Sequence, residues 1–133
     1  MAFVLDSSVA LAWLLPDETG QQTDALADRL EYESAHVPSI WPLEVSNALL
    51  TALRRKRITQ AEFERCFSAL SALPIESDSN AGLEQVLKIA QRFGLTSYDA
   101  AYLELAERRS LPLATLDQKL RQACKSLKVP VLP

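Results

Sequence analysis

The sequence predicts an α/β fold, a three-layer α/β/α domain with helices on both faces of a central, mostly parallel sheet of about five short strands. Short apolar runs alternate along the chain with longer segments of helical periodicity, which is the pattern of βαβ units. The 133 residues contain no repeat, no low-complexity tract and no linker. We therefore expect one domain over residues 1–133.

Apolar runs and helix-capping residues set the elements expected in the first half of the chain. In order, these are a strand over 3–5, a helix over 8–15 stopped by Pro16, a helix opened by PDETG (16–20) and ending near Tyr32, a strand over 36–38, a helix over 39–56 and a helix over 59–71. Ser39 and Thr59 are the expected N-caps of the last two helices. Their expected buried residues are Val45, Ala48, Leu49, Ala52 and Leu53 in the first, and Phe63, Phe67 and Leu70 in the second.

The second half continues the alternation. The expected elements are a strand over 73–76, a helix from about 79 to 93, a helix starting at Thr96 or Ser97, a strand over 113–116, a helix over 117–127 and a terminal strand over 129–133. Gly94 follows the first of these helices, where a left-handed residue commonly ends a helix.

Composition excludes several classes of protein. The net charge of −3 argues against coating nucleic acid through bulk positive charge. No apolar run is long enough to cross a membrane, and MAFVL is too short for a signal peptide, so we expect a cytoplasmic protein with no membrane partner. Cys66 and Cys124 belong to no metal-binding motif and are expected to be reduced thiols. His36 is the only histidine, and a structural role is expected for it.

Four acids occupy matching positions at strand ends and helix starts. Asp6 directly follows the first strand and Asp117 follows LATL; Glu44 and Asp99 fall in the first turns of helices. Taken singly, each suits an N-cap or a first-turn acid. In a parallel sheet, however, all four meet at one edge, where their mutual repulsion favours a bound cation. Ligands that are all oxygen select Mg²⁺ or Mn²⁺, and such sites typically act on phosphate esters.

Four stretches, VLDSSVALAWLLPDE, SIWPLEVSNAL, LTSYDAAYLELA and LATLDQKL, in this order resemble the PIN-domain family. Within that family they are most similar to the VapC-type toxins of bacterial toxin–antitoxin pairs. The resemblance covers essentially the whole chain. It implies a Mg²⁺- or Mn²⁺-dependent endoribonuclease, a homodimer, and a cognate VapB-type antitoxin whose C-terminal segment covers the acidic groove.

The resemblance also implies roles for particular residues. It assigns catalysis and metal binding to Asp6, Glu44, Asp99 and Asp117. It implies supporting polar residues beside the metal at Ser7 or Ser8, Asn47, Ser97 and Thr115. The implied reaction is hydrolysis of RNA phosphodiesters by a deprotonated water, leaving a 5′-phosphate and a 3′-hydroxyl.

Two further groups of residues have alternative interpretations. The basic run Arg54, Arg55, Lys56 and Arg57 is either the solvated end of a helix or a set of RNA phosphate contacts, and the two are compatible. The apolar residues Trp13, Leu14, Leu15 and Trp41 either pack in the core or form a surface for an antitoxin or a second copy.

Two other functions compete with the ribonuclease. A receiver-like Mg²⁺-binding signalling domain would need paired acids near the start, an acceptor Asp after the third strand and a Lys after the last, none of which is present here. The closer alternative is a catalytically weak or inactive binding module with the same fold. The presence of all four acids argues against it.

Overall fold

The fold was analysed in a computed structural model that describes residues 2–18 and 20–133. The elements run in the order β1 (Ala2–Leu5), α1 (Ser7–Leu14), α2 (Gln21–Arg29), β2 (Ser34–Pro38), α3 (Trp41–Arg54), α4 (Gln60–Ala72), β3 (Ile75–Asp78), α5 (Leu83–Phe93), α6 (Ser97–Arg109), β4 (Leu113–Ala114), α7 (Gln118–Leu127) and β5 (Val131–Leu132). Strands and helices alternate as predicted.

All strand pairings of the sheet are parallel, and the strand order is β3-β2-β1-β4-β5. The chain thus moves outward from β1 to β3, returns past β1 to β4, and moves outward again to β5. Each parallel connection must cross a face of the sheet, and helices provide these crossovers. The predicted three-layer α/β/α architecture with five short parallel strands is confirmed.

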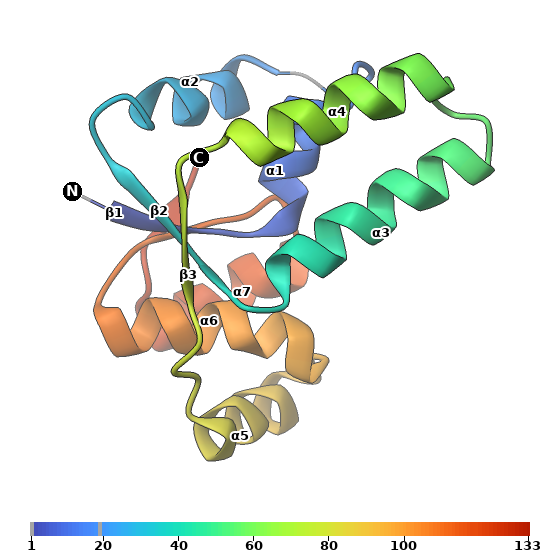
Figure 1. The fold of residues 1–133 in the computed structure, drawn as a ribbon. Coiled ribbons are helices and arrows are strands. Elements are labelled where there is room, and N and C mark those ends of the chain that lie inside the picture. Colours follow the sequence, from blue (N-terminus) through green and yellow to red (C-terminus); the bar gives the residue numbers. More distant parts are fainter. Residues whose placement is uncertain (1, 19) are drawn as a thin grey trace.

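The helices form two layers around the sheet (Figure 1). Helices α1 to α4, which belong to the β1–β2–β3 half, lie on one side, and α5 to α7 lie on the other. Helices α3 and α4 project together as an arm from one end of the sheet. The reversal of strand order falls between β1 and β4, and ligands of open α/β sheets bind at such switch points.

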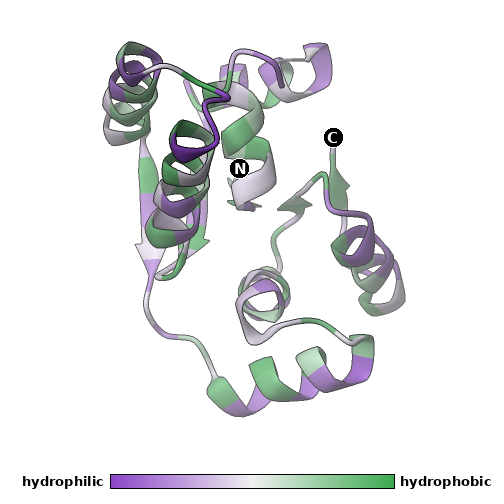
Figure 2. Ribbon diagram, turned by 90° about the vertical axis from the view of Figure 1, so that its right-hand side faces the viewer, coloured by the Kyte–Doolittle hydropathy of each residue, from purple (hydrophilic) through white to green (hydrophobic). Residues whose placement is uncertain are grey.

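Central strand β1 shows why the sheet forms the core. Phe3, Val4 and Leu5 are completely buried, because helices cover both faces of the sheet. Around this layer, α5 and α7 are the most clearly amphipathic helices, and Figure 2 shows both hydrophilic and hydrophobic segments on the helices. Cys66 and Cys124 are buried free thiols, as predicted. Within residues 2–18 and 20–133, no helix is both long and apolar enough to span a bilayer.

Several predicted helix boundaries are confirmed by cap geometry. The Thr59 hydroxyl accepts a hydrogen bond from Glu62 N, and the Glu62 side chain accepts one from Thr59 N, so the two residues form a capping box. Gly94 ends α5 in the left-handed conformation, with φ of 64°. Thr96 caps α6 and Asp117 caps α7, each through its side chain.

The prediction of Ser39 as an N-cap is wrong. Helix α3 begins at Trp41 after Ile40, and Ile40 has helical backbone angles and no side-chain cap. Pro42 lies in the first turn, where its fixed φ suits the helix and its missing N–H leaves one donor fewer to satisfy. Val45, Leu49 and Ala52 are buried as predicted, whereas the nearby Ala48 and Leu53 are only partly buried.

Phe67 was predicted to face inward, but its side chain is 54% exposed. The buried stripe of α4 runs through Phe63, Cys66 and Leu70, and Phe67 lies about 100° around the helix from Cys66. Cys66 takes the inward position, and its thiol donates to the Leu14 carbonyl at 3.1 Å.

Several elements differ from their predicted bounds; β4 and β5, for example, have two residues each, within the predicted 113–116 and 129–133. Helix α2 begins at Gln21 rather than within 16–20, because residues 16–18 form a turn that Arg57 fixes through Asp17; Thr19 lies outside the described residues. Strand β3 spans Ile75–Asp78 rather than 73–76, since Pro74 has no N–H for the ladder. Helix α5 starts later than 79 because Asp78 accepts from Asn80 N in a local turn.

Candidate acidic site at the switch point of the sheet

The four predicted acids lie at the edge of the sheet where β1 and β4 end. Asp6 follows β1 and Asp117 follows β4, the two strands that flank the switch point. Asp99 lies in the first turn of α6 and Glu44 in the first turn of α3. The name acidic edge is used below for Asp6, Glu44, Asp99 and Asp117.

Asp6 is the most buried of these acids, with 4% exposure, and it is firmly held. Its Oδ2 accepts hydrogen bonds from the Ser8 and Thr115 hydroxyls, each at 2.7 Å. Its Oδ1 accepts one from Ser7 N at 2.8 Å. Asp6 therefore caps α1 and also binds the segment after β4.

The two hydroxyls that hold Asp6 are themselves fixed by the turn between β4 and α7. Ser8 Oγ accepts from Leu116 N at 3.0 Å, and Thr115 Oγ1 accepts from Asp117 N at 3.0 Å. Ser8 thus has the closer side-chain bond to Asp6, since the Ser7 hydroxyl lies 3.5 Å from Oδ1. These bonds join the two strand ends of the switch point into one rigid unit.

Glu44 is half-buried and faces α6. Its Oε1 accepts a hydrogen bond from the hydroxyl of Tyr102, a completely buried residue one turn beyond Asp99. Glu44 also lines a cleft with Ile40, Leu43, Asn47 and Tyr98. Asn47 thus lies in the same cleft as Glu44, and it is exposed.

The charges of the acidic edge interact. Burial raises the pKa of Asp6, and the charge of Asp117 adds to this effect. Burial also raises the pKa of Glu44, with Asp6 and Asp99 adding to it, and the pKa of Asp99, with Asp6 and Asp117 adding. Glu44 and Asp117 thus each interact with both Asp6 and Asp99.

No cation neutralises this edge within the described residues. None of the four carboxylates forms a salt bridge there, and Lys119 lowers the pKa of Asp99 more weakly than burial and the neighbouring acids raise it. Over residues 2–18 and 20–133, no three His, Cys, Asp or Glu side chains converge on one point closely enough to enclose an ion. The four acids therefore lie along the edge of the sheet and do not surround a single point.

The other predicted polar residues, Thr115 and Ser97, differ in whether they contact the acids. Thr115 is completely buried and bonded to Asp6. Ser97 is the first residue of α6 and is exposed, and it is the Thr96 hydroxyl that accepts from Asp99 N at 3.0 Å. Thr96 thus caps the turn that carries Asp99.

The basic run lies at the opposite end of α3 from Glu44. Arg54 is the last residue of the helix, ten residues or about 15 Å along its axis from Glu44. Arg57 pairs with Asp17 at 3.0 Å and with Glu18 at 3.4 Å, so it joins the α3–α4 turn to the loop after α1.

The predicted structural residues are also placed. His36 is buried in β2, its Nδ1 lies 3.0 Å from Arg109 Nη1, and burial lowers its pKa. Trp41 and Leu15 are buried in the core, whereas Trp13 and Leu14 are partly buried against it. Trp13 Nε1 donates to the Thr23 carbonyl, which ties α1 to α2.

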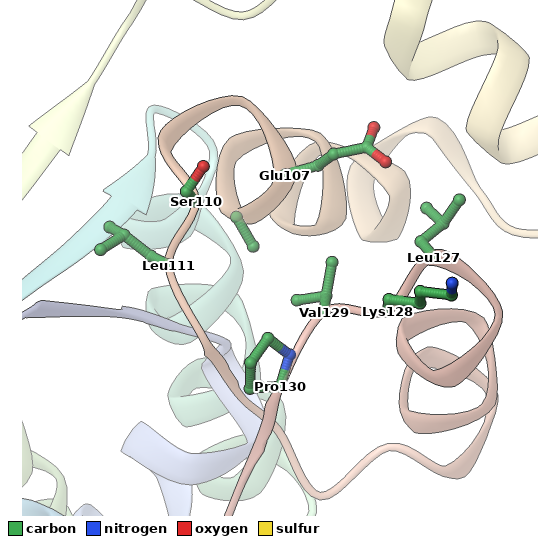
Figure 3. A pocket seen from close by; sticks show the side chains of 8 residues that line it. Glu107, Ser110, Leu111, Leu127, Lys128, Val129 and Pro130 are labelled. Carbon is green, nitrogen blue, oxygen red and sulfur yellow. The ribbon is translucent and has the colours of Figure 1, made fainter.

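A separate hollow of about 230 Å³ lies at the other end of α6 and α7 (Figure 3). Its lining includes Glu107, Ser110, Lys128 and Pro130. Glu107 lies in the last turn of α6, and the other three residues follow α6 or α7, whereas Asp99 and Asp117 lie at the N-terminal ends of these helices. The hollow is therefore not part of the acidic edge.

The acid pattern did not reveal Tyr102 as part of the site. At helical spacing from Tyr98, Tyr102 suits either base stacking or packing, with packing the more common role, and its ring does pack in the core. A usable signal was present, because Tyr102 lies three residues after Asp99 and so on the same face of α6. A buried tyrosine hydroxyl also needs a hydrogen-bond partner.

Fold and acidic edge together define the class of protein: a doubly wound α/β domain with uncompensated carboxylates at its switch point. The chain belongs to the PIN domain family, whose model matches residues 3–126. The curated relatives include Ribonuclease VapC9 of Mycobacterium tuberculosis, 35% identical over 118 residues that cover 88% of this chain and 87% of the relative. Ribonuclease VapC3 of Pyrobaculum aerophilum is 29% identical, with 98% of this chain and all of the relative covered.

Solved structures show the same fold. The crystal structure of PAE2754 from Pyrobaculum aerophilum aligns with a TM-score of 0.71 and 26% identity, covering 98% of this chain and 83% of that one. A toxin–antitoxin complex from Klebsiella pneumoniae aligns with a TM-score of 0.59 and 18% identity, covering 88% of each chain. At that identity the second likeness concerns the fold alone.

Proposed function

We propose that this protein is a metal-dependent endoribonuclease that acts as the toxin of a toxin–antitoxin pair. The observation that carries the proposal is the acidic edge at the switch point, where burial and neighbouring carboxylates raise the pKa values of Asp6, Glu44 and Asp99. Membership of the PIN domain family and relatives named as ribonucleases support it.

The chemistry of the donor set fits Mg²⁺ or Mn²⁺. All four groups are carboxylates, and no Cys or His lies among them, which is the ligand type that hard divalent cations prefer. Asp6, Asp99 and Asp117 would hold the ion, with Glu44 assisting, after their side chains have moved closer together than they lie in this structure. When bound, such an ion lowers the pKa of water and stabilises charge on a phosphodiester.

The chain's own residues would prepare this chemistry. Ser8 and Thr115 keep Asp6 in one orientation through hydrogen bonds to Oδ2. Thr96 fixes the turn that presents Asp99. The cleft beside Glu44, with Asn47 and Tyr98 in its lining, would bind the RNA next to the scissile bond. Arg54, Arg55 and Lys56 would contact phosphates farther along the strand.

The partners follow from the same proposal. A toxin needs an inhibitor, and the fold is shared with a toxin–antitoxin complex, so we propose a VapB-type antitoxin that covers the acidic edge. We also propose a homodimer and a cytoplasmic location, where RNA substrates are present. The alternative function, a PIN-fold binding module without useful activity, keeps the same partners but lacks turnover.

Cleavage of structured RNA separates the two functions. We expect the purified chain to cleave with added Mn²⁺ and to stop when the metal is chelated. Asp99→Asn should lose more than about a hundredfold in kcat/KM, because residues that only orient ligands typically account for ten- to hundredfold. Mapping the product ends should show 5′-phosphates.

Asp78→Asn is the matched control, since it makes the same chemical change at an acid that is paired with Arg108. We expect its kcat/KM to stay within about twofold of the wild-type value. Equal cleavage by the wild type and Asp99→Asn would identify a contaminating nuclease and contradict the proposal.

A further inference from the structure

Tyr102 has a hydroxyl group that core packing does not explain. The residue is completely buried, and a phenylalanine would bury the same ring. A buried hydroxyl costs free energy unless it finds a hydrogen-bond partner. The hydroxyl therefore has to be understood through the group that it meets.

That group is the carboxylate of Glu44. The Tyr102 hydroxyl donates to Glu44 Oε1, and this is the single hydrogen bond of the Glu44 side chain within residues 2–18 and 20–133. Asp6, in contrast, accepts bonds from Ser7, Ser8 and Thr115. Glu44 thus depends on one donor, whereas Asp6 has several.

The bond restricts a side chain that would otherwise be mobile. Glutamate has three rotatable bonds, and ordering its side chain costs up to about 2 kcal/mol of conformational entropy. The tyrosine ring is fixed by the surrounding core, so its hydroxyl is a rigid donor. A hydroxyl has one hydrogen and engages one oxygen of the carboxylate, which leaves Oε2 available.

Helix α6 thereby contributes two residues to the acidic edge, one as a member and one as a hydrogen-bond donor to a member. It carries Asp99 directly, and one turn later it carries the residue that holds Glu44 of α3. The Glu44 carboxylate held in this way lies close enough to Asp6 and Asp99 for their charges to interact. The ring of Tyr102 therefore packs in the core, while its hydroxyl contacts a residue of the acidic edge.

We propose that Tyr102 is a positioning residue, whose buried hydroxyl holds the Glu44 carboxylate against the rest of the acidic edge before a cation or RNA binds. The inference rests on the proposed function, because holding Glu44 matters only if the acidic edge binds an ion. It goes beyond that function because it assigns a role in the site to an uncharged residue outside the four acids.

The test is Tyr102→Phe in the full chain, which removes one oxygen atom and keeps the ring. We expect a ten- to hundredfold lower kcat/KM for Mn²⁺-dependent RNA cleavage, mainly through kcat. Mn²⁺ binding to the protein alone, measured by calorimetry, should weaken. Tyr32→Phe is the matched control, because Tyr32 is 73% exposed and its variant should retain wild-type values.

A double-mutant cycle shows whether the loss acts through Glu44. Adding Tyr102→Phe to Glu44→Gln should reduce kcat/KM by less than about twofold further. The same ten- to hundredfold loss in both backgrounds would overturn the proposal, as would wild-type activity and Mn²⁺ binding in Tyr102→Phe.

Two measurements keep the proposal testable in other circumstances. If the wild type cleaves no RNA, the proposed function fails, but the comparison of Mn²⁺ binding between wild type and Tyr102→Phe still tests positioning. If Tyr102→Phe does not fold, near-ultraviolet difference spectra of wild type and Glu44→Gln report on the buried tyrosine. We expect a shifted tyrosine band, and identical spectra would overturn the proposal.

Discussion

Helix α6 contributes to two groups of acids, one paired with an arginine and one without a paired cation in the part of the chain that the structure describes. Its first turn brings Asp99 to the acidic edge. Its later turns carry Glu104 and Arg108, which meet Asp78 at the end of β3. Arg108 Nε donates to Glu104 Oε1 at 2.7 Å, and its Nη2 donates to Asp78 Oδ1 at 3.0 Å. Asp78, Glu104 and Arg108 are called the arginine-paired cluster below.

The difference between the two groups lies in their partners. The hydrogen bond from Arg108 holds the pKa of Asp78 below its ordinary value. Burial, together with the charges of Asp6 and Asp117, moves the pKa of Asp99 upward. Buried acids are therefore no indication of function in themselves. Carboxylates that are brought together without a cation are the informative case, because they cost stability unless something binds them.

Of the changes considered, removal of Arg108 should alter the free energy of unfolding most. Arg108→Ala leaves Glu104, which is 2% exposed, without its cation, and leaves Asp78 with the longer pair to Arg109 at 3.6 Å. We expect the free energy of unfolding to fall by about 3 kcal/mol, the low end for breaking a buried pair, since Arg108 is one-third exposed. Urea unfolding measures the change. Lys88→Ala, which breaks an exposed pair with Glu84, should change it by less than about 0.5 kcal/mol.

The same Asp→Asn change should have opposite signs in the two groups. Asp78→Asn should lower the free energy of unfolding by about 2 kcal/mol, because it weakens hydrogen bonds to a charged group. With a chelator present, Asp99→Asn should raise it by about 1 kcal/mol, since it removes a charge from an unneutralised cluster. Thermal unfolding of both variants checks this, and a loss of stability in Asp99→Asn would contradict it.

The pH dependence should show the smallest effect, within about 1 kcal/mol. An acid with a raised folded pKa loses its penalty as pH falls, so the stability advantage of Asp99→Asn over wild type should shrink between pH 7 and about pH 4. An acid with a lowered folded pKa contributes until pH falls below its unfolded value of about 3.9. The deficit of Asp78→Asn should therefore stay constant over that range and shrink only below it.

Urea unfolding at a series of pH values, with a chelator present, measures how the stability difference between each variant and the wild type changes with pH. A constant advantage of Asp99→Asn from pH 7 to pH 4 would show that its carboxylate is not destabilised in the folded state.

The sequence predicted those features that local patterns determine. Alternating apolar runs and helical segments gave the parallel sheet, and the position of Asp6 and Asp117 after strands placed both at its carboxyl edge. The capping box at Thr59 and the left-handed Gly94 were also predictable, because each depends on a few neighbouring residues.

Features that depend on distant contacts were missed. Phe67 and Cys66 are adjacent, and only the packing of α4 against α1 decides which of them is buried. The choice between Ser7 and Ser8 depends on Leu116 N, more than a hundred residues away. The partner of the Tyr102 hydroxyl depends in the same way on how α3 lies against α6.

One feature of the site bears on how the protein is made. Asp6 leaves the ribosome long before Thr115, because its bond to Thr115 joins positions 109 residues apart. Central strand β1 likewise lacks its neighbour β4 until that segment has been synthesised. A nascent or prematurely ended chain that stops before Thr115 would contain Asp6, Glu44 and Asp99 without Asp117 and without the hydroxyl that fixes Asp6. Translation thus completes the acidic edge only after more than a hundred residues have been added beyond Asp6.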